Sequence, residues 1–445
     1  LKVRQLQDQH NSPFPNLWSP SSIHSFVGIE VVSMVLQAAA TLVVVLCTLV
    51  RSDNIAPPNS EAAATWNIQT ESVNSVGAAI LVELFADPDN LEVEILASFS
   101  AWSESPLYVD SIRSVLFTSP SDRNLYAYNL DSEKTSILIE NAGVFSGVYD
   151  RDIPFDECNE CGPNGLTMGL AGFEDYVFMN QLGLARILAF NPADLTDIFI
   201  VADEYNGTEF NSPNDVTLTA DRQSLYFTDP TFGLQRAGDT GQPGFVDSFA
   251  RSELGFQGVY RLDAEDVESG NTEPQLVVAE MPGPNGVAVT NDGAYLIVSN
   301  TGNESAWDPY WNVYVVEDTA TDLYALEKTI TLPSDLVYDG DVPLADGMEV
   351  YSDDILLAVC PGGICVMDLN EKEIVARIAI DHLVSNLNIY DGYIYVSSAD
   401  NLFRIALDQF VLDSTTTTAE PEGDAATTTS TLVVASIIMV MMIYL

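Results

Sequence analysis

Between about residue 62 and residue 412, hydrophobic residues fall in short runs that often alternate with polar ones. The runs are rich in Val, Ile, Leu, Tyr and Phe, and Asp-Gly, Asn-Gly and Pro-Gly pairs separate them. No long segment here repeats its hydrophobic residues with the period of a helix. Short alternating runs between turn residues are typical of strands, so we expect an all-β sandwich, barrel or propeller.

One pattern recurs six times and distinguishes among these three folds. Each copy has a short polar start, an alternating strand, a turn rich in Asp, Asn or Gly, and a second apolar strand. The copies begin at Glu104, Pro163, Pro213, Pro284, Ala345 and Ser385. Their spacing suits four-stranded blades with variable loops, whereas a sandwich would not repeat one hairpin six times. The predicted fold is therefore a six-bladed β-propeller.

The leading polar residue of each copy is a candidate for chemistry. In a propeller the first strand of every blade runs along the central channel, so a residue at its start points into the channel mouth. These residues are Glu104, Asn164, Asn214, Asn285, Asp346 and the Asn386/Asn388 region. Carboxylate and amide oxygens without sulfur or imidazole favour Ca²⁺ or Mg²⁺, and Ca²⁺ suits ligands from several blades. Such a cation could polarise a carbonyl or phosphoryl oxygen while a carboxylate activates water.

A plainer interpretation exists for each single motif. Asn-Gly and Asp-Gly pairs are common turn dipeptides, so one isolated pair indicates a turn more often than a ligand. Repetition at blade spacing favours the metal site. Asp215 could orient Asn214 or be a turn residue, and Asp229 is expected to cap a strand rather than to react.

The motifs resemble those of a known family. NSPNDVTLTADRQSLYFTDPTFGL, from Asn211, is similar to the signature of the gluconolactonases, regucalcin (senescence marker protein) and luciferin-regenerating enzymes. GPNGVAVTNDGAYLIVSNT, ADGMEV and SESPLYVD resemble the family's other blade motifs, in the same order. The resemblance implies that Glu104, Asn285 and Asp346 bind a catalytic Ca²⁺, with another divalent cation as an alternative. It also implies that Asp346 acts as base or nucleophile.

The same resemblance implies roles for two further asparagines. Asn214 would bind the ion directly or through water and reach the substrate, and Asn164 is expected to bind substrate or to support the ligands. The expected activity is calcium-dependent hydrolysis of a lactone, with an aldonolactone as substrate. Alternatives are a promiscuous esterase or phosphotriesterase at the same ion, and a non-catalytic surface propeller that calcium rigidifies. Asn388 stands where a fluorophosphatase-like propeller carries a histidine beside a second metal, so a second calcium is not expected.

The net charge limits which binding partners we expect, and the histidine content limits which reaction mechanisms we expect. The 65 acidic and 16 basic residues give a formal net charge of −49. This argues against nucleic acids and anionic membrane surfaces as partners. Of the three histidines, His10 and His24 precede the expected mature protein, which leaves little material for a histidine-dyad mechanism. We expect a monomer whose partner is a small-molecule lactone.

Four cysteines lie in two close pairs, Cys158 with Cys161 and Cys360 with Cys365. They could ligate zinc, but no histidine supports that assignment and the second spacing is loose. Two local disulfides in an extracellular protein are the better interpretation. The sequons at Asn206 and Asn303 agree with secretion.

The ends of the chain differ in composition from the predicted propeller, which we place at residues 62–412. Residues 1–52 form a leader whose apolar stretch from Met34 to Ser52 is typical of a signal peptide or N-terminal anchor. Residues 413–431 are a Thr-rich stalk, and residues 432–445 are an apolar tail. The tail fits a glycolipid-anchor signal or a simple membrane anchor. We therefore expect a protein of the secretory pathway that is held at the cell surface.

Overall fold

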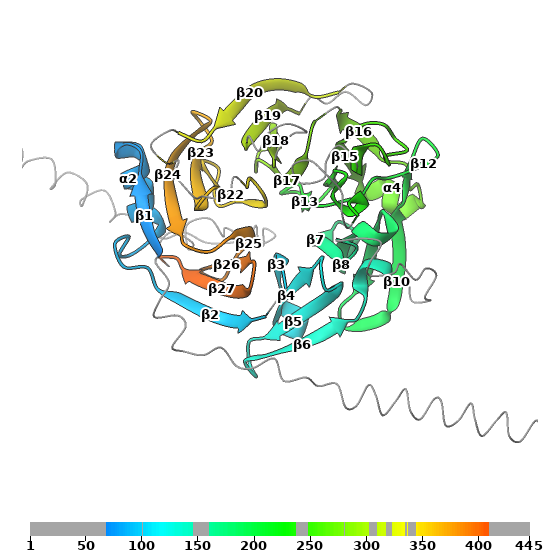
Figure 1. The fold of residues 1–445 in the computed structure, drawn as a ribbon, viewed down its shortest axis with the longest axis horizontal. Helices are drawn as coiled ribbons and strands as arrows, with labels where there is room; N and C mark the ends of the chain where they lie inside the picture. The colour runs from blue at the N-terminus through cyan, green and yellow to red at the C-terminus, as the bar shows by residue number, and fades with distance from the viewer. Residues whose placement is uncertain are drawn as a thin grey trace, which may run out of the picture.

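Six antiparallel sheets form a ring around a central channel in the computed structural model (Figure 1). The structure describes residues 68–99, 101–145, 160–236, 248–279, 281–301, 309–316, 323–333, 336 and 344–408. In each sheet one strand lines the channel and the others follow outward. The predicted six-bladed β-propeller is therefore confirmed.

Four blades are built from consecutive strands, ordered from the channel outward. The first contains β3 (Glu104–Val109), β4 (Ser114–Ser119), β5 (Asn124–Asn129) and β6 (Lys134–Ile139). The second contains β7 (Pro163–Leu170), β8 (Phe173–Gln181), β9 (Arg186–Asn191) and β10 (Asp194–Ala202). The third contains β13 (Val216–Leu218), β14 (Ser224–Asp229), β15 (Gly258–Asp263) and β16 (Gln275–Val278). The fourth contains β17 (Pro284–Val289), β18 (Tyr295–Asn300), β19 (Tyr310–Val315) and β20 (Ala325–Thr331).

The last two blades each include a strand from the N-terminal part of the chain. The fifth contains β21 (Met348–Val350), β22 (Ile355–Cys360), β23 (Gly363–Asp368) and β24 (Glu373–Ile380), with β1 (Ile68–Ser72) outside β24. The sixth contains β25 (Val384–Tyr390), β26 (Tyr393–Ser398) and β27 (Asn401–Ala406), with β2 (Val93–Ser98) outside β27. The pairing of β2 with β27 closes the ring between the two ends of the propeller.

The second strand of a blade is buried on both faces because it lies between two neighbouring blades. Every residue of β14 is buried. Successive side chains of a strand point to opposite faces. Phe227 accordingly packs with Phe178 of the preceding blade, whereas Tyr226 packs with Val298 of the following one. The core is thus a set of apolar layers between blades, which explains the short and nearly continuous hydrophobic runs.

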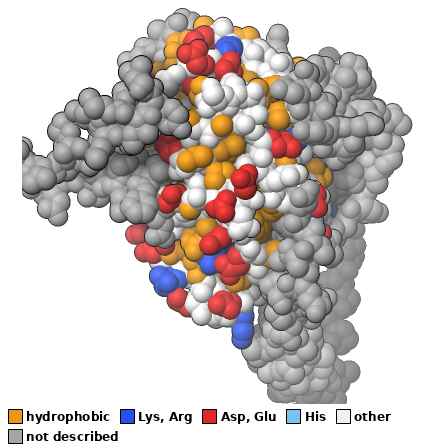
Figure 2. All heavy atoms as spheres, turned by 90° about the vertical axis from the view of Figure 1, so that its left-hand side faces the viewer, with side chains coloured by type: hydrophobic (Ala, Val, Ile, Leu, Met, Phe, Trp, Pro, Cys, Tyr) orange, Lys and Arg blue, Asp and Glu red, His pale blue; other side chains and the backbone are white. Residues whose placement is uncertain are grey.

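A few small elements complete the described fold. Helix α2 (Ser75–Leu84) joins β1 to β2, and the side chain of Asn74 caps its start by accepting hydrogen bonds from the Val76 and Gly77 amides, each at 2.9 Å. The remaining elements are α4 (Ala264–Ser269), β11 (Glu204–Tyr205), β12 (Thr208–Glu209) and the 3₁₀ turns η2 (Asp110–Ile112), η3 (Ala142–Val144), η4 (Leu182–Leu184) and η5 (Phe232–Leu234). Figure 2 shows the side of the molecule at the left of Figure 1, where acidic side chains are spread among apolar ones with a few basic ones between them.

Several sequence-based expectations concern residues outside the described part. The leader (1–52), the stalk (413–431), the apolar tail (432–445), Cys158 and Asn303 all lie there. Asn206 is described and lies exposed at the turn between β11 and β12. Of the helices that the structure describes, none combines the length and the apolar character needed to cross a bilayer.

The cysteine predictions can be compared with the structure at three positions. Cys360 and Cys365 form a disulfide that joins β22 to β23, which confirms that pair. Cys161 is also disulfide-bonded. The zinc alternative is therefore wrong for these three residues.

Candidate functional site

Each predicted site residue lies at the start of an innermost strand. Glu104 opens β3, Asn164 and Asn285 are the second residues of β7 and β17, and Asn214 and Asp346 stand two residues before β13 and β21. All five are at most 5% exposed. Because the innermost strands of a propeller run in one direction, these starts meet at one end of the channel.

Glycines beside these residues allow the blades to approach closely. A Cβ atom at Gly286 would overlap the carbonyl oxygen of Asp346, and one at Gly347 would overlap the amide of Asn386. The Asn-Gly and Asp-Gly pairs that contain Gly286 and Gly347 are therefore not turns. They mark places where the leading residue of the next blade contacts a glycine backbone that has no side chain.

Buried hydroxyls on the second strands hold the leading residues from behind. Each donates to the carbonyl oxygen of the leading residue in the next blade. The bonds run from Thr118 to Asn164 (2.9 Å), from Thr228 to Asn285 (2.7 Å) and from Ser299 to Asp346 (3.0 Å). Sequence reasoning missed these hydroxyls, although a Thr or Ser recurs at the same place in FTS, FTD and VSN of the copies.

Two oxygens at this end of the channel are buried without a hydrogen-bond partner among the described residues. One is Glu104 Oε2, whose companion Oε1 accepts a bond of 2.6 Å from Trp102 Nε1. The other is Asn285 Oδ1, whose amide nitrogen donates to Thr301 Oγ1 at 2.7 Å. Leaving such an atom unpaired costs about 1–3 kcal/mol. Both belong to predicted metal ligands, so the donors that are present fit an oxygen-coordinated cation.

The carboxyl groups at this end repel one another. Burial raises the pKa of Glu104 well above its usual value, and the charge of Asp346 raises it further. Burial likewise raises the pKa of Asp346, followed by the charges of Asp215 and Glu160, while a hydrogen bond from Asn285 acts in the opposite direction. A divalent cation would offset this repulsion. Among the described residues no three Asp, Glu, His or Cys side chains form a metal site by themselves, so a cation would also need amide oxygens.

Glu160 is a functional candidate that sequence reasoning missed. Burial raises its pKa to about 7, and its charge raises the pKa of both Glu104 and Asp346. The one feature of the sequence that could have identified Glu160 is its position three residues before Pro163, where the second copy begins.

Asp215 has neither of the two roles considered for it. Its carboxylate accepts hydrogen bonds from the Val287 amide at 3.1 Å and from Asn386 Nδ2 at 3.4 Å. It therefore ties the third blade to the fourth and the sixth. Burial raises its pKa to about 6 although these bonds lower it.

A cavity of about 330 Å³ is lined by residues of the innermost strands, Asp215 and Asn386 among them. Glu349 and Asn388 line it, whereas Glu104, Asn214, Asn285 and Asp346 do not. Both asparagines considered for the sixth copy line this cavity, and Asn386 also donates a hydrogen bond to Asp215.

Asp229 supports the loop that carries Asn214. Its carboxylate accepts bonds from the Asn211 amide at 3.0 Å and the Ser212 amide at 2.8 Å. Burial raises its pKa to about 7. These contacts agree with the predicted role in capping rather than in reaction.

Comparison with known proteins gives one family. The model of the SMP-30/Gluconolactonase/LRE-like region matches residues 102–389. A gluconolactonase of Zymomonas mobilis subsp. mobilis is 28% identical over 275 residues, which cover 62% of this chain and 68% of that protein.

Solved structures agree in fold. A gluconolactonase of Xanthomonas campestris superposes with a TM-score of 0.57 at 19% identity, over 77% of this chain and 96% of that one. A luciferin-regenerating enzyme superposes with a TM-score of 0.50 at 11% identity, over 71% and 95% of the two chains. The family model covers more than half of the chain and includes every leading residue from Glu104 to Asn388. The chain belongs to the SMP-30/gluconolactonase/LRE-like family.

Proposed function

We propose that this protein is a lactone hydrolase of the gluconolactonase type that uses one divalent cation, Ca²⁺, held by Glu104, Asn214, Asn285 and Asp346. The family membership and the gluconolactonase relative support the reaction class. The observation that carries the metal site is the pair of buried oxygens without partners, Glu104 Oε2 and Asn285 Oδ1. An oxygen-only donor set with two carboxylates suits Ca²⁺.

The chemistry follows from the residues at the channel mouth. A bound divalent cation supplies a Lewis acid that polarises the lactone carbonyl. Asp346 accepts a proton from water as the water oxygen bonds to the carbonyl carbon. The ring C–O bond then breaks, and the proton passes from Asp346 to the departing alkoxide, which leaves an open-chain hydroxy acid. Asn164 and Asn214 offer amide groups that can bind substrate hydroxyls.

Gluconolactone opening by the purified full chain tests this function. We expect activity that a chelator abolishes and added Ca²⁺ restores, and a fall of about 100-fold or more in Asp346→Asn. Asp353→Asn, an exposed change in the same blade, is the matched control and should keep the wild-type rate. Equal rates for wild type with and without chelator, Asp346→Asn and Asp353→Asn would refute the proposal. Cleavage of aryl esters or phosphotriesters without lactone opening would instead support the esterase or phosphotriesterase alternative.

We propose further that the protein is exported and anchored at the cell surface. The apolar stretch from Met34 to Ser52 and the Cys360–Cys365 disulfide, which suits an oxidising compartment, support this. Surface labelling of intact cells, with and without glycolipid-cleaving phospholipase, tests it. A protein that is labelled only after lysis would contradict it.

A further inference from the structure

We propose that Arg377 is a positioning residue for Asp346, and that Glu71 on β1 is required for this role. The link to catalysis rests on the proposed function of Asp346, whereas the structural link can be tested alone. Strand β1 precedes the family-matched residues 102–389 and adds a fifth strand to the blade that carries Asp346. A segment outside the matched region would thus support the reacting group.

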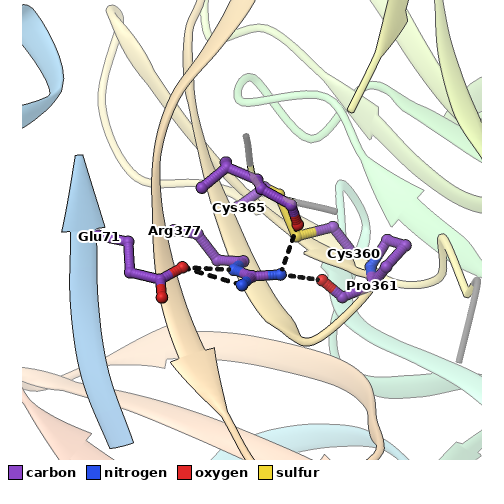
Figure 3. The surroundings of a disulfide bond; sticks show 6 residues. Glu71, Cys360, Pro361, Cys365 and Arg377 are labelled. Atoms are coloured by element: carbon purple, nitrogen blue, oxygen red, sulfur yellow. Dashed lines mark hydrogen bonds and ion pairs between the residues drawn. A yellow bond between two sulfur atoms is a disulfide. The ribbon is translucent and has the colours of Figure 1, made fainter. Parts of the chain in front are cut away.

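Arg377 lies in the interior of the fifth blade, where Figure 3 shows it between Glu71 and the disulfide. Its side chain is 2% exposed. Nε and Nη2 donate to Glu71 Oε2 at 3.1 and 2.9 Å. Nη1 donates to the carbonyl oxygens of Pro361 at 2.7 Å and Leu336 at 3.0 Å. One buried guanidinium therefore joins the edge strand β1 to two segments of backbone.

The first of these segments leads directly to Asp346. Pro361 follows Cys360, the last residue of β22. One residue earlier, the Val359 amide donates to the Gly347 carbonyl at 2.9 Å, and the Val359 carbonyl accepts from the Asp346 amide at 3.4 Å. A shift of the turn at Pro361 would therefore move the backbone that sets the position of Asp346.

The second segment precedes Asp346 in the chain. The side chain of Leu336 is buried in the apolar cluster that also contains Cys360, Cys365 and Ala345. The bond from Arg377 to the Leu336 carbonyl adds a polar attachment to this apolar one. Arg377 thus binds one backbone carbonyl before Asp346 in the chain, that of Leu336, and one after it, that of Pro361.

Charge makes Glu71 necessary to this arrangement. A buried cation is costly unless an anion compensates it, and removing one partner of a buried pair leaves an uncompensated charge. Glu71 is 25% exposed, so its loss admits water toward Arg377 and weakens the hold on the carbonyls. We expect the guanidinium to turn toward solvent in Glu71→Gln.

The chain offers a matched control. Glu94 on β2 and Arg404 on β27 form a pair at 2.6 Å that also joins an N-terminal strand to the edge of a blade. Their side chains are 54% and 20% exposed, and the pair lies in the sixth blade. Glu94→Gln therefore removes the same chemical group without touching backbone next to Asp346.

The experiment compares wild type, Glu71→Gln, Arg377→Lys and Glu94→Gln at a temperature well below the lowest Tm. We expect Glu71→Gln and Arg377→Lys to lower kcat for lactone opening about tenfold and to raise the half-saturating Ca²⁺ concentration about tenfold, with KM within about twofold. If Arg377 only stabilised the fold, the variants would have a lower Tm, but kcat would not fall while KM stayed nearly constant. Glu94→Gln should match wild type, and equal kcat and Ca²⁺ requirement in all four proteins would overturn the proposal.

Hydrogen exchange separates this inference from the proposed function. In Glu71→Gln, but not in Glu94→Gln, amides in the peptide spanning 344–360 should exchange faster than in wild type. If wild type opens no lactone but this difference is seen, the proposed function fails and the structural link stands. If wild type is active and exchange in this peptide is unchanged, the positioning role is refuted.

Discussion

The hydroxyl of Thr301 has one proton, and it donates that proton to the carbonyl oxygen of Ala345 at 2.7 Å. Toward Asn285 it can therefore only accept, which it does from Nδ2 at 2.7 Å. This fixes the orientation of the amide, with the nitrogen bonded and Oδ1 left without a hydrogen-bond partner among the described residues. Thr301 thus decides which atom of Asn285 is left without a hydrogen-bond partner.

Thr301→Val tests this chain of bonds. Valine has nearly the same shape but cannot accept a hydrogen bond, so the Asn285 amide loses its fixed orientation. We expect the half-saturating Ca²⁺ concentration in the lactonase assay to rise about tenfold. Thr301→Ser keeps the hydroxyl and should stay near wild type, and if both variants behave alike, the hydroxyl does not orient the amide.

Glu349 gives a pH dependence at the same scale. Burial raises its pKa from the usual 4.5 to about 8, the charge of Asp215 adds to this, and a hydrogen bond with Asn388 lowers it. Between these two values the folded protein binds more protons than the unfolded chain, so the free energy of unfolding falls as pH rises. In chelator, Glu349→Gln should show a smaller fall in Tm than wild type between about pH 5 and about pH 8. Parallel Tm profiles for the two proteins would contradict this account.

At the scale of elements, the contact between neighbouring strand starts sets the geometry of the site. Gly286 lies against the Asp346 carbonyl, and the Ser299 hydroxyl holds both residues, accepting from the Gly286 amide at 2.7 Å and donating to the Asp346 carbonyl at 3.0 Å. Strands β17 and β21 can therefore not separate or slide without breaking bonds to Ser299.

Gly286→Ala tests this close approach. The added methyl group would overlap backbone that cannot move aside, so we expect a destabilisation of about 2–3 kcal/mol and loss of lactonase activity. Gly293→Ala is the control, since nothing lies near its Cβ position and only its φ of +70° opposes the change. Its cost should be about 1 kcal/mol with activity retained. Chemical denaturation measures both, and a smaller loss for Gly286→Ala would contradict the contact.

The sequence predicted the strands and their leading polar residues better than the side chains that hold those residues in place. Hydrophobic alternation and the six leading polar residues were enough to predict the blades and to place Glu104, Asn285 and Asp346 at the starts of innermost strands, because both patterns repeat along the chain. Glu160, Thr301 and the bridging role of Asp215 do not repeat in the same way, and their contacts are set by which blades become neighbours. The outer positions of β1 and β2 likewise depend on pairing with strands about 300 residues later.

The whole molecule is a closed ring that carries strong negative charge. The net charge of −49 makes the compact state repel itself, and salt at about 0.15 M screens charges beyond about 8 Å. We expect Tm to rise with NaCl at neutral pH. At matched ionic strength, Ca²⁺ should raise Tm further in wild type but not in Glu104→Gln, because only the first protein keeps both of the carboxylates that we propose as ligands. An equal response of the two proteins would assign the calcium effect to bulk charge.

A crystal structure of the protein grown with Ca²⁺, with the ion located by anomalous scattering, would show whether the leading residues hold a cation. We expect one ion within about 2.3–2.6 Å of Glu104 Oε2, Asn285 Oδ1 and a carboxylate oxygen of Asp346. Calcium bound elsewhere, with ordered water alone beside those three side chains, would contradict it.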